Sequence, residues 1–248
     1  MDCTAWPRPW RLSRRQLGAA ALASLMPVPA WALETLLITA VNKAGSSAVA
    51  ARLLAEIYRR AGLGLQVEVL PAARASLVAL SDKADGELVR IASYGQTYPQ
   101  LVRVDPAFYR VSVRAYSLAA RSAQVQTRDD LHHYTVAAIR GMAYAQELTD
   151  NHPALTLTQN PLQLFRMLAA GRVDVVVCAT LAAQQTVNGL GLRDLDVSPE
   201  LARFELHHYL HARRRALAPR LAEVIRHMRD SGELEQLTQQ YEAGAQAD

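Results

Sequence analysis

Hydrophobic and polar positions follow one another along the chain in an order that predicts strands followed by helices. A short apolar run begins at residue 36 and is followed by a segment with a helical apolar stripe. An alternating segment, a second helical segment and another short apolar run come next. The expected strands are 36–41, 65–70 and 87–91, and the expected helices are 48–61 and 71–80. Ser46 or Ser47 is the expected cap of the first helix and Gly62 its expected end. Strands separated by helices are typical of a parallel sheet.

The same order returns in the second part of the chain. The expected elements are a strand at 134–139, a helix from near Gly141, a strand at 155–157, a helix from Pro161 capped by Asn160 and ended by Gly171, and a strand at 173–178. Segments 110–119 and 205–211 have the pattern of extended chain, and helices beginning at Pro219 and near Glu233 follow.

Two α/β units joined by two extended segments predict a two-lobed α/β fold, each lobe a mixed, mostly parallel sheet flanked by helices. Lobe 1 is expected to comprise 33–112 plus 204–248, and lobe 2 to comprise 113–203. Because ligands of open α/β sheets bind at the carboxyl ends of the strands, we expect a ligand cleft between the lobes.

The first 32 residues have the pattern of a secretory signal. Four arginines precede an apolar stretch at 17–28, and Ala30-Trp31-Ala32 supplies a small-x-small cleavage site. The stretch is shorter than the roughly 20 residues of a membrane span. Arg14 and Arg15 also fit a twin-arginine export signal, with general secretion as the alternative. We therefore expect cleavage near Ala32 and a periplasmic protein.

Composition changes the picture once this leader is set aside. The 248 residues are 50% hydrophobic and 20% charged, which is globular composition. Removing the leader lowers the net charge from +4 to +1, so charge gives no reason to expect nucleic-acid binding. Cys178 is then the one remaining cysteine, which excludes an internal disulfide. The expected cleavage point has no cysteine, so we do not expect a lipoprotein.

Several fragments together resemble the bacterial extracellular solute-binding proteins of family 3, which have the periplasmic binding-protein type II fold. They are DGELVR at 85–90, GRVDVVV at 171–177, HYLH at 208–211, LAPRL at 217–221 and MRDSGEL at 228–234. The resemblance implies capture of a small solute by closure of two lobes, usually for an ABC-type membrane transporter. Some members of the family are sensor domains, and a few are dehydratases.

The chain departs from family members that bind amino acids. Those members usually place an aromatic residue after the first strand, but 42–45 holds none. They carry an Asp where this chain has Ala179 or a neighbour, and a T-x-x-R motif that is absent from 94–98. These departures argue against a standard α-amino acid, so we expect a small organic anion or an amino-acid-like solute.

Arginines at strand ends are the first candidates for ligand contact. Arg90 ends a predicted strand, and a guanidinium suits a carboxylate through two parallel hydrogen bonds. The alternative is a structural ion pair with Glu87, although residues three apart do not share a face of an ideal strand. Arg140, Gly141 and Met142 lie where a strand meets a helix, a place that favours anions. The alternative there is a plain turn that needs Gly.

The remaining candidates are less specific. Asn42 lies in the first strand–helix loop, and Tyr94 and Tyr116 offer aromatic faces for stacking, with a core or hinge role as the alternative. We expect Asp174 to make structural hydrogen bonds and Cys178 to be inert packing.

No catalytic residue, metal or cofactor is expected. The histidines cluster at 132–133 and 207–211, but neighbouring positions on a strand face opposite sides and no metal-binding frame accompanies them. A dehydratase on the same scaffold is the alternative, and Glu87 is its one obvious carboxylate, without an evident acid–base partner. A sensor or partner-docking module is the other alternative. The expected partners are a small solute and a transporter complex, with the chain a monomer.

Overall fold

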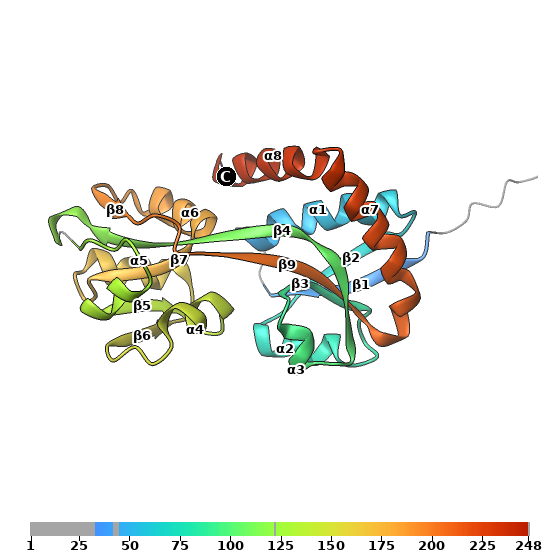
Figure 1. The fold of residues 1–248 in the computed structure, drawn as a ribbon, viewed down its shortest axis with the longest axis horizontal. Coiled ribbons are helices and arrows are strands. Elements are labelled where there is room, and N and C mark those ends of the chain that lie inside the picture. Colours follow the sequence, from blue (N-terminus) through green and yellow to red (C-terminus); the bar gives the residue numbers. More distant parts are fainter. Residues whose placement is uncertain (1–32, 42–44, 122, 248) are drawn as a thin grey trace, which may run out of the picture. The chain divides into compact units, whose positions relative to one another are not determined.

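One hydrogen-bonded sheet of nine strands runs through the part of the chain that the structure describes (Figure 1). The structure is a computed structural model, and it describes residues 33–41, 45–121 and 123–247. The strand order is β2-β1-β3-β9-β4-β7-β5-β6, with β8 paired to β4. The strands are β1 (Thr35–Ala40), β2 (Gly64–Val69), β3 (Gly86–Ile91), β4 (Leu101–Leu118), β5 (Val136–Ile139), β6 (Leu155–Thr158), β7 (Val175–Ala179), β8 (Leu195–Val197) and β9 (Ala202–His211).

Helices cover both faces of this sheet. They are α1 (Ser46–Arg60), α2 (Ala72–Ala79), α3 (Tyr94–Thr97), α4 (Ala143–Thr149), α5 (Pro161–Ala169), α6 (Thr180–Leu190), α7 (Ala218–Asp230) and α8 (Glu233–Ala247). Three short 3₁₀ segments, Ala119–Arg121, Asp129–His133 and Ala212–Leu217, complete the described elements. None of the helices in residues 33–41, 45–121 and 123–247 combines the length and apolarity that a membrane crossing requires.

The sheet has two halves, each with its own core. In the first half, parallel β1, β2 and β3 pack with α1, α7 and α8 around fully buried side chains that include Ile38, Leu53 and Ile57. In the second half, parallel β5, β6 and β7 have α4 on one face and α5 with α6 on the other. The predicted α/β fold class is therefore confirmed.

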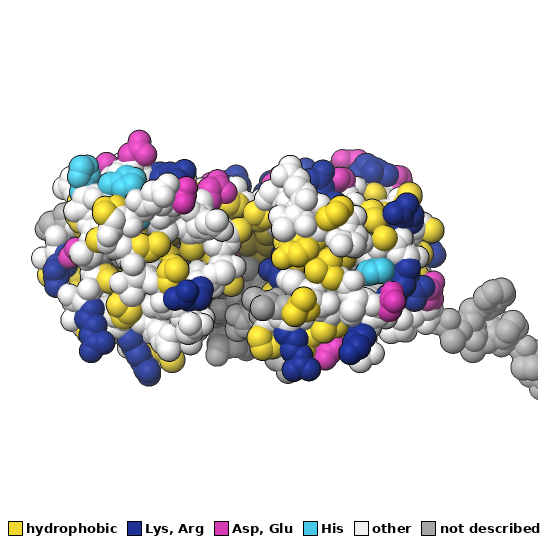
Figure 2. All heavy atoms as spheres, turned by 90° about the horizontal axis from the view of Figure 1, so that it is seen from below, with side chains coloured by type: hydrophobic (Ala, Val, Ile, Leu, Met, Phe, Trp, Pro, Cys, Tyr) yellow, Lys and Arg dark blue, Asp and Glu magenta, His cyan; other side chains and the backbone are white. Residues whose placement is uncertain are grey.

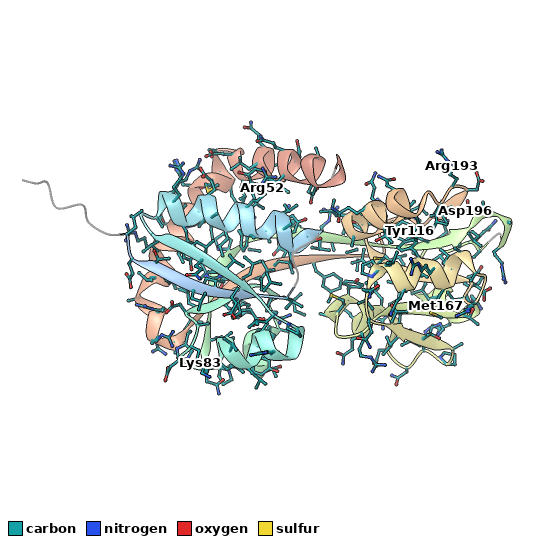
Figure 3. All side chains as sticks on the ribbon, turned by 180° about the vertical axis from the view of Figure 1, so that it is seen from behind. Arg52, Lys83, Tyr116, Met167, Arg193 and Asp196 are labelled. Atoms are coloured by element: carbon teal, nitrogen blue, oxygen red, sulfur yellow. The ribbon has the colours of Figure 1, made fainter. Side chains whose placement is uncertain are left out.

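Alternation along the strands places α1 and α2 on opposite faces of the first half. Ile38 of β1 belongs to the core under α1, whereas the neighbouring Thr39 hydroxyl donates to the Ala75 carbonyl of α2 at 3.2 Å. Figure 1 shows the same division, with α1 and α8 on one side of the strands and α2 and α3 on the other. Arg52 of α1 reaches under α8, where its guanidinium carbon lies 3.9 Å from the centre of the Tyr241 ring (Figure 3).

Two long antiparallel strands, β4 and β9, join the halves. The first part of β4 pairs with β9 and its last part with β7, while the end of β9 pairs with β3. The extended segments predicted at 110–119 and 205–211 lie in these two strands. The predicted lobe boundaries stay a prediction.

Most predicted elements are present, but some details of the prediction are wrong. Gly45 at φ 58°, rather than Ser46 or Ser47, precedes α1, and no side chain caps that helix. The strand predicted from 173 begins at Val175. The sequence did not predict α6 or β8, because α6 follows β7 directly, with no polar loop to mark its start. The predicted signal at 1–32 and the candidate Asn42 lie outside the described residues.

Candidate functional site

The carboxyl ends of the parallel strands in both halves face the same short stretch of β4. Ile91, the last residue of β3, pairs with Leu206 of β9, which pairs with Tyr109 of β4. Ala179, the last residue of β7, pairs with Val113 of β4. Tyr109 and Val113 are four residues apart, or roughly 13 Å along a strand. Ligands of open α/β sheets bind at such strand ends, so we expect the ligand-binding site there.

An ion pair occupies the first-half side of this region. Arg90 Nη2 donates to Glu87 Oε1 and, at 3.1 Å, to Ser76 Oγ of α2. The Glu87 side chain is 1% exposed and the Arg90 side chain 20% exposed. A carboxylate withdrawn from water in this way requires a cation and hydrogen bonds, and Arg90 supplies both.

The expectation that Glu87 and Arg90 lie on different sides of the strand is wrong. The register between β3 and β9 shifts between these two residues, so the strand is not ideal there. A β-bulge re-aims the side chains that follow it, which lets two residues three apart share one face. Both side chains therefore point to the face that α2 covers.

Tyr94, the first residue of α3, covers the ion pair. Its ring centre lies 4.9 Å from the guanidinium carbon of Arg90, a distance typical of a cation–π contact. Its ring also packs edge-on against Tyr209, at 5.6 Å between centroids. Burial raises the pKa of Tyr94 to about 12. The residues Ser76, Glu87, Arg90 and Tyr94 are called the β3 cluster below.

Three polar atoms of the β3 cluster lack hydrogen bonds. Glu87 Oε2, Arg90 Nε and the Tyr94 hydroxyl are buried, and none of them has a hydrogen-bond partner among the described residues. Buried polar atoms in native proteins are nearly always paired, with protein, water or ligand. Three such atoms in one cluster are unusual for a purely structural ion pair.

A buried histidine supports the cluster from the opposite face of the sheet. His208 Nδ1 donates to the Glu87 carbonyl at 2.9 Å, and the Tyr58 hydroxyl of α1 donates to His208 Nε2 at 2.9 Å. A carbonyl can only accept, so the proton is assigned to Nδ1. Burial lowers the pKa of His208 to about 4, which keeps the ring neutral at pH 7.

Arg140, Gly141 and Met142 follow β5; the first two are exposed, whereas Met142 is partly buried against the cores of the second half. The Arg140 side chain is exposed, and no ion pair to it is found in the described part of the chain. Gly141 adopts φ +78°, and Met142 is the extended residue before α4. The helix begins at Ala143, two residues later than the strand–helix pattern predicts, because the left-handed glycine first reverses the chain.

Another candidate residue lies elsewhere. Tyr116 is buried in the core of the second half, edge-on to Phe165 with 5.5 Å between ring centres (Figure 3). Its position matches the core alternative better than a stacking face in the cleft. Asn42 belongs to residues 42–44, which the structure does not describe.

A cavity of about 550 Å³ lies between the halves on the α8 side of the linking strands. Residues of the first half, of β4 and of the second half line it, among them Ser46, Arg110, Ser112, Thr180 and Glu200. A cleft between the lobes is expected from the sequence, but its lining by Arg110, Ser112, Thr180 and Glu200 is not. Its one sequence signal is the alternation of polar Arg110 and Ser112 with apolar neighbours in an extended segment.

Asp174 and Cys178 have the structural surroundings that their sequence positions predict. Asp174 Oδ2 accepts from the amide and the hydroxyl of Thr135, at 3.0 and 2.6 Å, and these bonds lower its pKa. Cys178 is fully buried, and desolvation raises its pKa to about 12. Within the described residues, no three His, Cys, Asp or Glu side chains come together as a metal site.

Comparison with known proteins places the fold. No family model matches the chain. An uncharacterized protein from Shewanella oneidensis is 26% identical over 190 residues, which is 73% of this chain and 71% of the relative.

Solved structures resemble the chain over most of its length. A mutant of the T. maritima arginine-binding protein ArgBP gives a TM-score of 0.66 at 18% identity, covering 83% of this chain and 94% of that one. A histidine kinase sensor domain with similarity to periplasmic binding proteins gives 0.70 at 17%, covering 84% and 96%. The GluR0 ligand-binding core in complex with L-glutamate gives 0.73 at 10%, covering 84% and 98%. The chain has the two-lobed α/β fold of periplasmic binding proteins, while membership of family 3 stays a prediction.

Proposed function

We propose that this chain is a solute-binding protein that captures a small carboxylate-bearing solute between its two halves. The solute is an organic anion or an amino-acid-like molecule. The observation that carries the proposal is the β3 cluster, in which a partly exposed guanidinium with an unpaired Nε lies at the carboxyl end of a strand. A guanidinium binds a carboxylate through two parallel hydrogen bonds, and Arg90 is fixed well enough to do so.

Proteins of the same fold support this class of solute. The structural neighbours include proteins bound to arginine, to glutamine and to L-glutamate, all of which carry a carboxylate. In the proposal, the exposed Arg140 and the amides that follow Gly141 contact the solute from the second half. A solute that touches both halves favours the arrangement in which they close on it.

We further propose export and non-enzymatic action. The N-terminal basic, apolar and small-residue pattern supports export to the periplasm, and the resemblance to family 3 supports delivery to an ABC-type transporter. A sensing role is the second candidate, since one structural neighbour is a sensor domain. The dehydratase alternative is disfavoured, because Glu87, its one candidate carboxylate, is buried in the ion pair with Arg90.

A thermal-shift screen of amino acids, dicarboxylates and aromatic acids tests the proposal. A molecule that binds only the folded chain raises the melting temperature, by an amount set by its concentration and dissociation constant. We expect at least one carboxylate to do so and Arg90→Ala to abolish the effect. Arg59→Ala is the matched control, because Arg59 forms an ion pair with Glu56, also three residues apart, and its side chain on α1 is 68% exposed. Absence of any shift across the screen rejects the proposal, and turnover of a hit supports the enzyme instead.

A further inference from the structure

We infer that Glu87 is a positioning residue, whose buried carboxylate fixes the Arg90 guanidinium in the orientation that receives the solute. This inference rests on the proposed function. Glu87 itself is out of reach of a solute, since its side chain is 1% exposed. It acts through Arg90, its one ion-pair partner among the described residues.

The backbone that carries Glu87 is held on both sides. At Gly86, an added Cβ would come within 2.2 Å of the Tyr209 carbonyl oxygen of β9, so the two strands meet there more closely than any other residue permits. At Glu87 itself, the carbonyl accepts from buried His208. The backbone of Glu87 is therefore fixed in the sheet. A carboxylate on a fixed backbone can hold the Arg90 guanidinium in one orientation.

The guanidinium is in turn held at Nη2, while 20% of the Arg90 side chain stays exposed. Glu87 and Ser76 both take hydrogen bonds from Nη2, and Tyr94 lies against the guanidinium. Nε has no hydrogen-bond partner among the described residues. A side chain ordered before the solute arrives loses less conformational entropy on binding, which raises affinity without any new contact. Removing Glu87 would release Arg90 to many rotamers.

A double-mutant cycle on binding separates this role from simple stabilisation. The probes are L-arginine, L-glutamine, L-glutamate and succinate, each titrated by calorimetry into the full chain. For a probe that binds, we expect Glu87→Gln to weaken affinity about ten-fold or more, and Glu87→Asp to weaken it less, because the charge stays. In the Arg90→Lys background, Glu87→Gln should change affinity less than about two-fold, because the planar guanidinium that Glu87 orients is already absent.

The matched pair Glu56 and Arg59 on α1 serves as control, and its variants should leave affinity unchanged and additive. Equal effects of Glu87→Gln in both backgrounds, or tighter binding in Glu87→Gln, overturn the inference but leave the proposed function standing. If neither these four probes nor any carboxylate of the thermal-shift screen binds the wild-type chain, the inference falls together with a carboxylate site at Arg90.

A second measurement needs no solute and covers the outcome that Glu87→Gln folds poorly. In nitrogen-15 spectra of the full chain, the Arg90 Nε–H should give an ordered signal, with relaxation like that of the backbone. Glu87→Asp should increase its motion while leaving the Arg59 signal unchanged. A signal for Arg90 that is as mobile as an exposed arginine in the wild-type chain contradicts the inference directly.

Discussion

Arg90, near the end of β3 in the first half, and Arg140, directly after β5 in the second half, differ in how they are held. Arg90 is mostly buried and bound to Glu87 and to Ser76 of α2. Arg140 is exposed and has no ion pair in the described part of the chain. The comparison shows that two arginines at similar strand ends differ in order before binding. Arg90 is already held in place, whereas Arg140 must be ordered by the solute that it binds. Ordering a long side chain on binding costs about 0.5–1.5 kcal/mol.

The cause of the difference lies in the chain around each arginine. In the first half, a register shift turns Glu87 and Arg90 to the same face, where α2 and Tyr94 cover them. In the second half, the chain leaves β5 through Gly141 at φ +78°, and the added Cβ of that glycine would meet nothing within 4 Å. The surroundings of Arg90 are therefore closely packed, and the chain next to Arg140 is open.

The largest expected effect is that of Arg90→Ala on solute binding. Loss of the ordered guanidinium should weaken the affinity of a carboxylate found in the screen by at least about 100-fold, or about 2.7 kcal/mol, measured by calorimetry. Because the substitution leaves buried Glu87 without a cation, the unfolding temperature should fall as well.

Arg90→Lys distinguishes the two effects. Lysine keeps the charge beside Glu87 but lacks the planar fork, so we expect a folded chain with much weakened binding. Wild-type affinity in Arg90→Lys would show that charge alone, rather than the ordered fork, makes the first half different from the second.

The next effect concerns the pH dependence of stability that buried His208 should cause. Burial lowers the pKa of His208 from its ordinary value of 6.5 to about 4 in the folded chain. Between these values the unfolded chain binds a proton that the folded chain does not, so stability falls as pH falls from about 6.5 to about 4. The loss should approach about 3 kcal/mol at pH 4, measured by denaturant unfolding at a series of pH values.

His208→Gln provides the control for this pH effect. The variant should lose most of the slope between pH 6.5 and 4. A weaker slope should remain, because burial also lowers the pKa of His207. If the slope in His208→Gln is unaltered, the buried His208 ring is not the cause of the pH dependence of stability.

The sequence predicted elements wherever local signals mark both ends. The helix Pro161–Ala169 is such a segment, since Asn160 accepts from the Gln163 amide at 2.9 Å, Pro161 starts the helix and Gly171 adopts φ +64° beyond it. The helix α6 has no such start, because Thr180 follows the last strand residue directly. Local marks therefore decided which helices were predicted.

The site could be predicted only in part, for a physical reason. The positions of Arg90 and Arg140 at strand ends follow from local pattern. The Glu87–Arg90 pair depends on a bulge against β9 and on Ser76 of α2, which are contacts between distant segments. The cavity beside Arg110 and Thr180 likewise needs three separate parts of the chain. A single sequence read in order carries little information about such contacts.

A smaller effect is expected from substituting the glycines that border the two arginines. Gly141→Ala should lower the free energy of unfolding by about 1 kcal/mol, from backbone strain at φ +78° alone, since its Cβ meets no neighbour. Gly86→Ala, next to Glu87, should cost considerably more, because its Cβ would overlap the Tyr209 carbonyl oxygen. Denaturant unfolding measures both, and equal losses would contradict the contrast between a packed first half and an open second half.

The smallest expected effect is that of Arg140→Ala on binding. An exposed, unpaired cation contributes little before the solute arrives and must be ordered when it does, so we expect affinity to fall only about two- to five-fold. Arg172→Ala is the matched control, because Arg172 is equally exposed but precedes β7, at the opposite end of the parallel strands. Its removal should leave affinity unchanged in the same calorimetric titration. A loss for Arg140→Ala as large as that for Arg90→Ala would mean that the solute itself orders the second half, and that burial in the free chain is a poor guide to which arginine matters more.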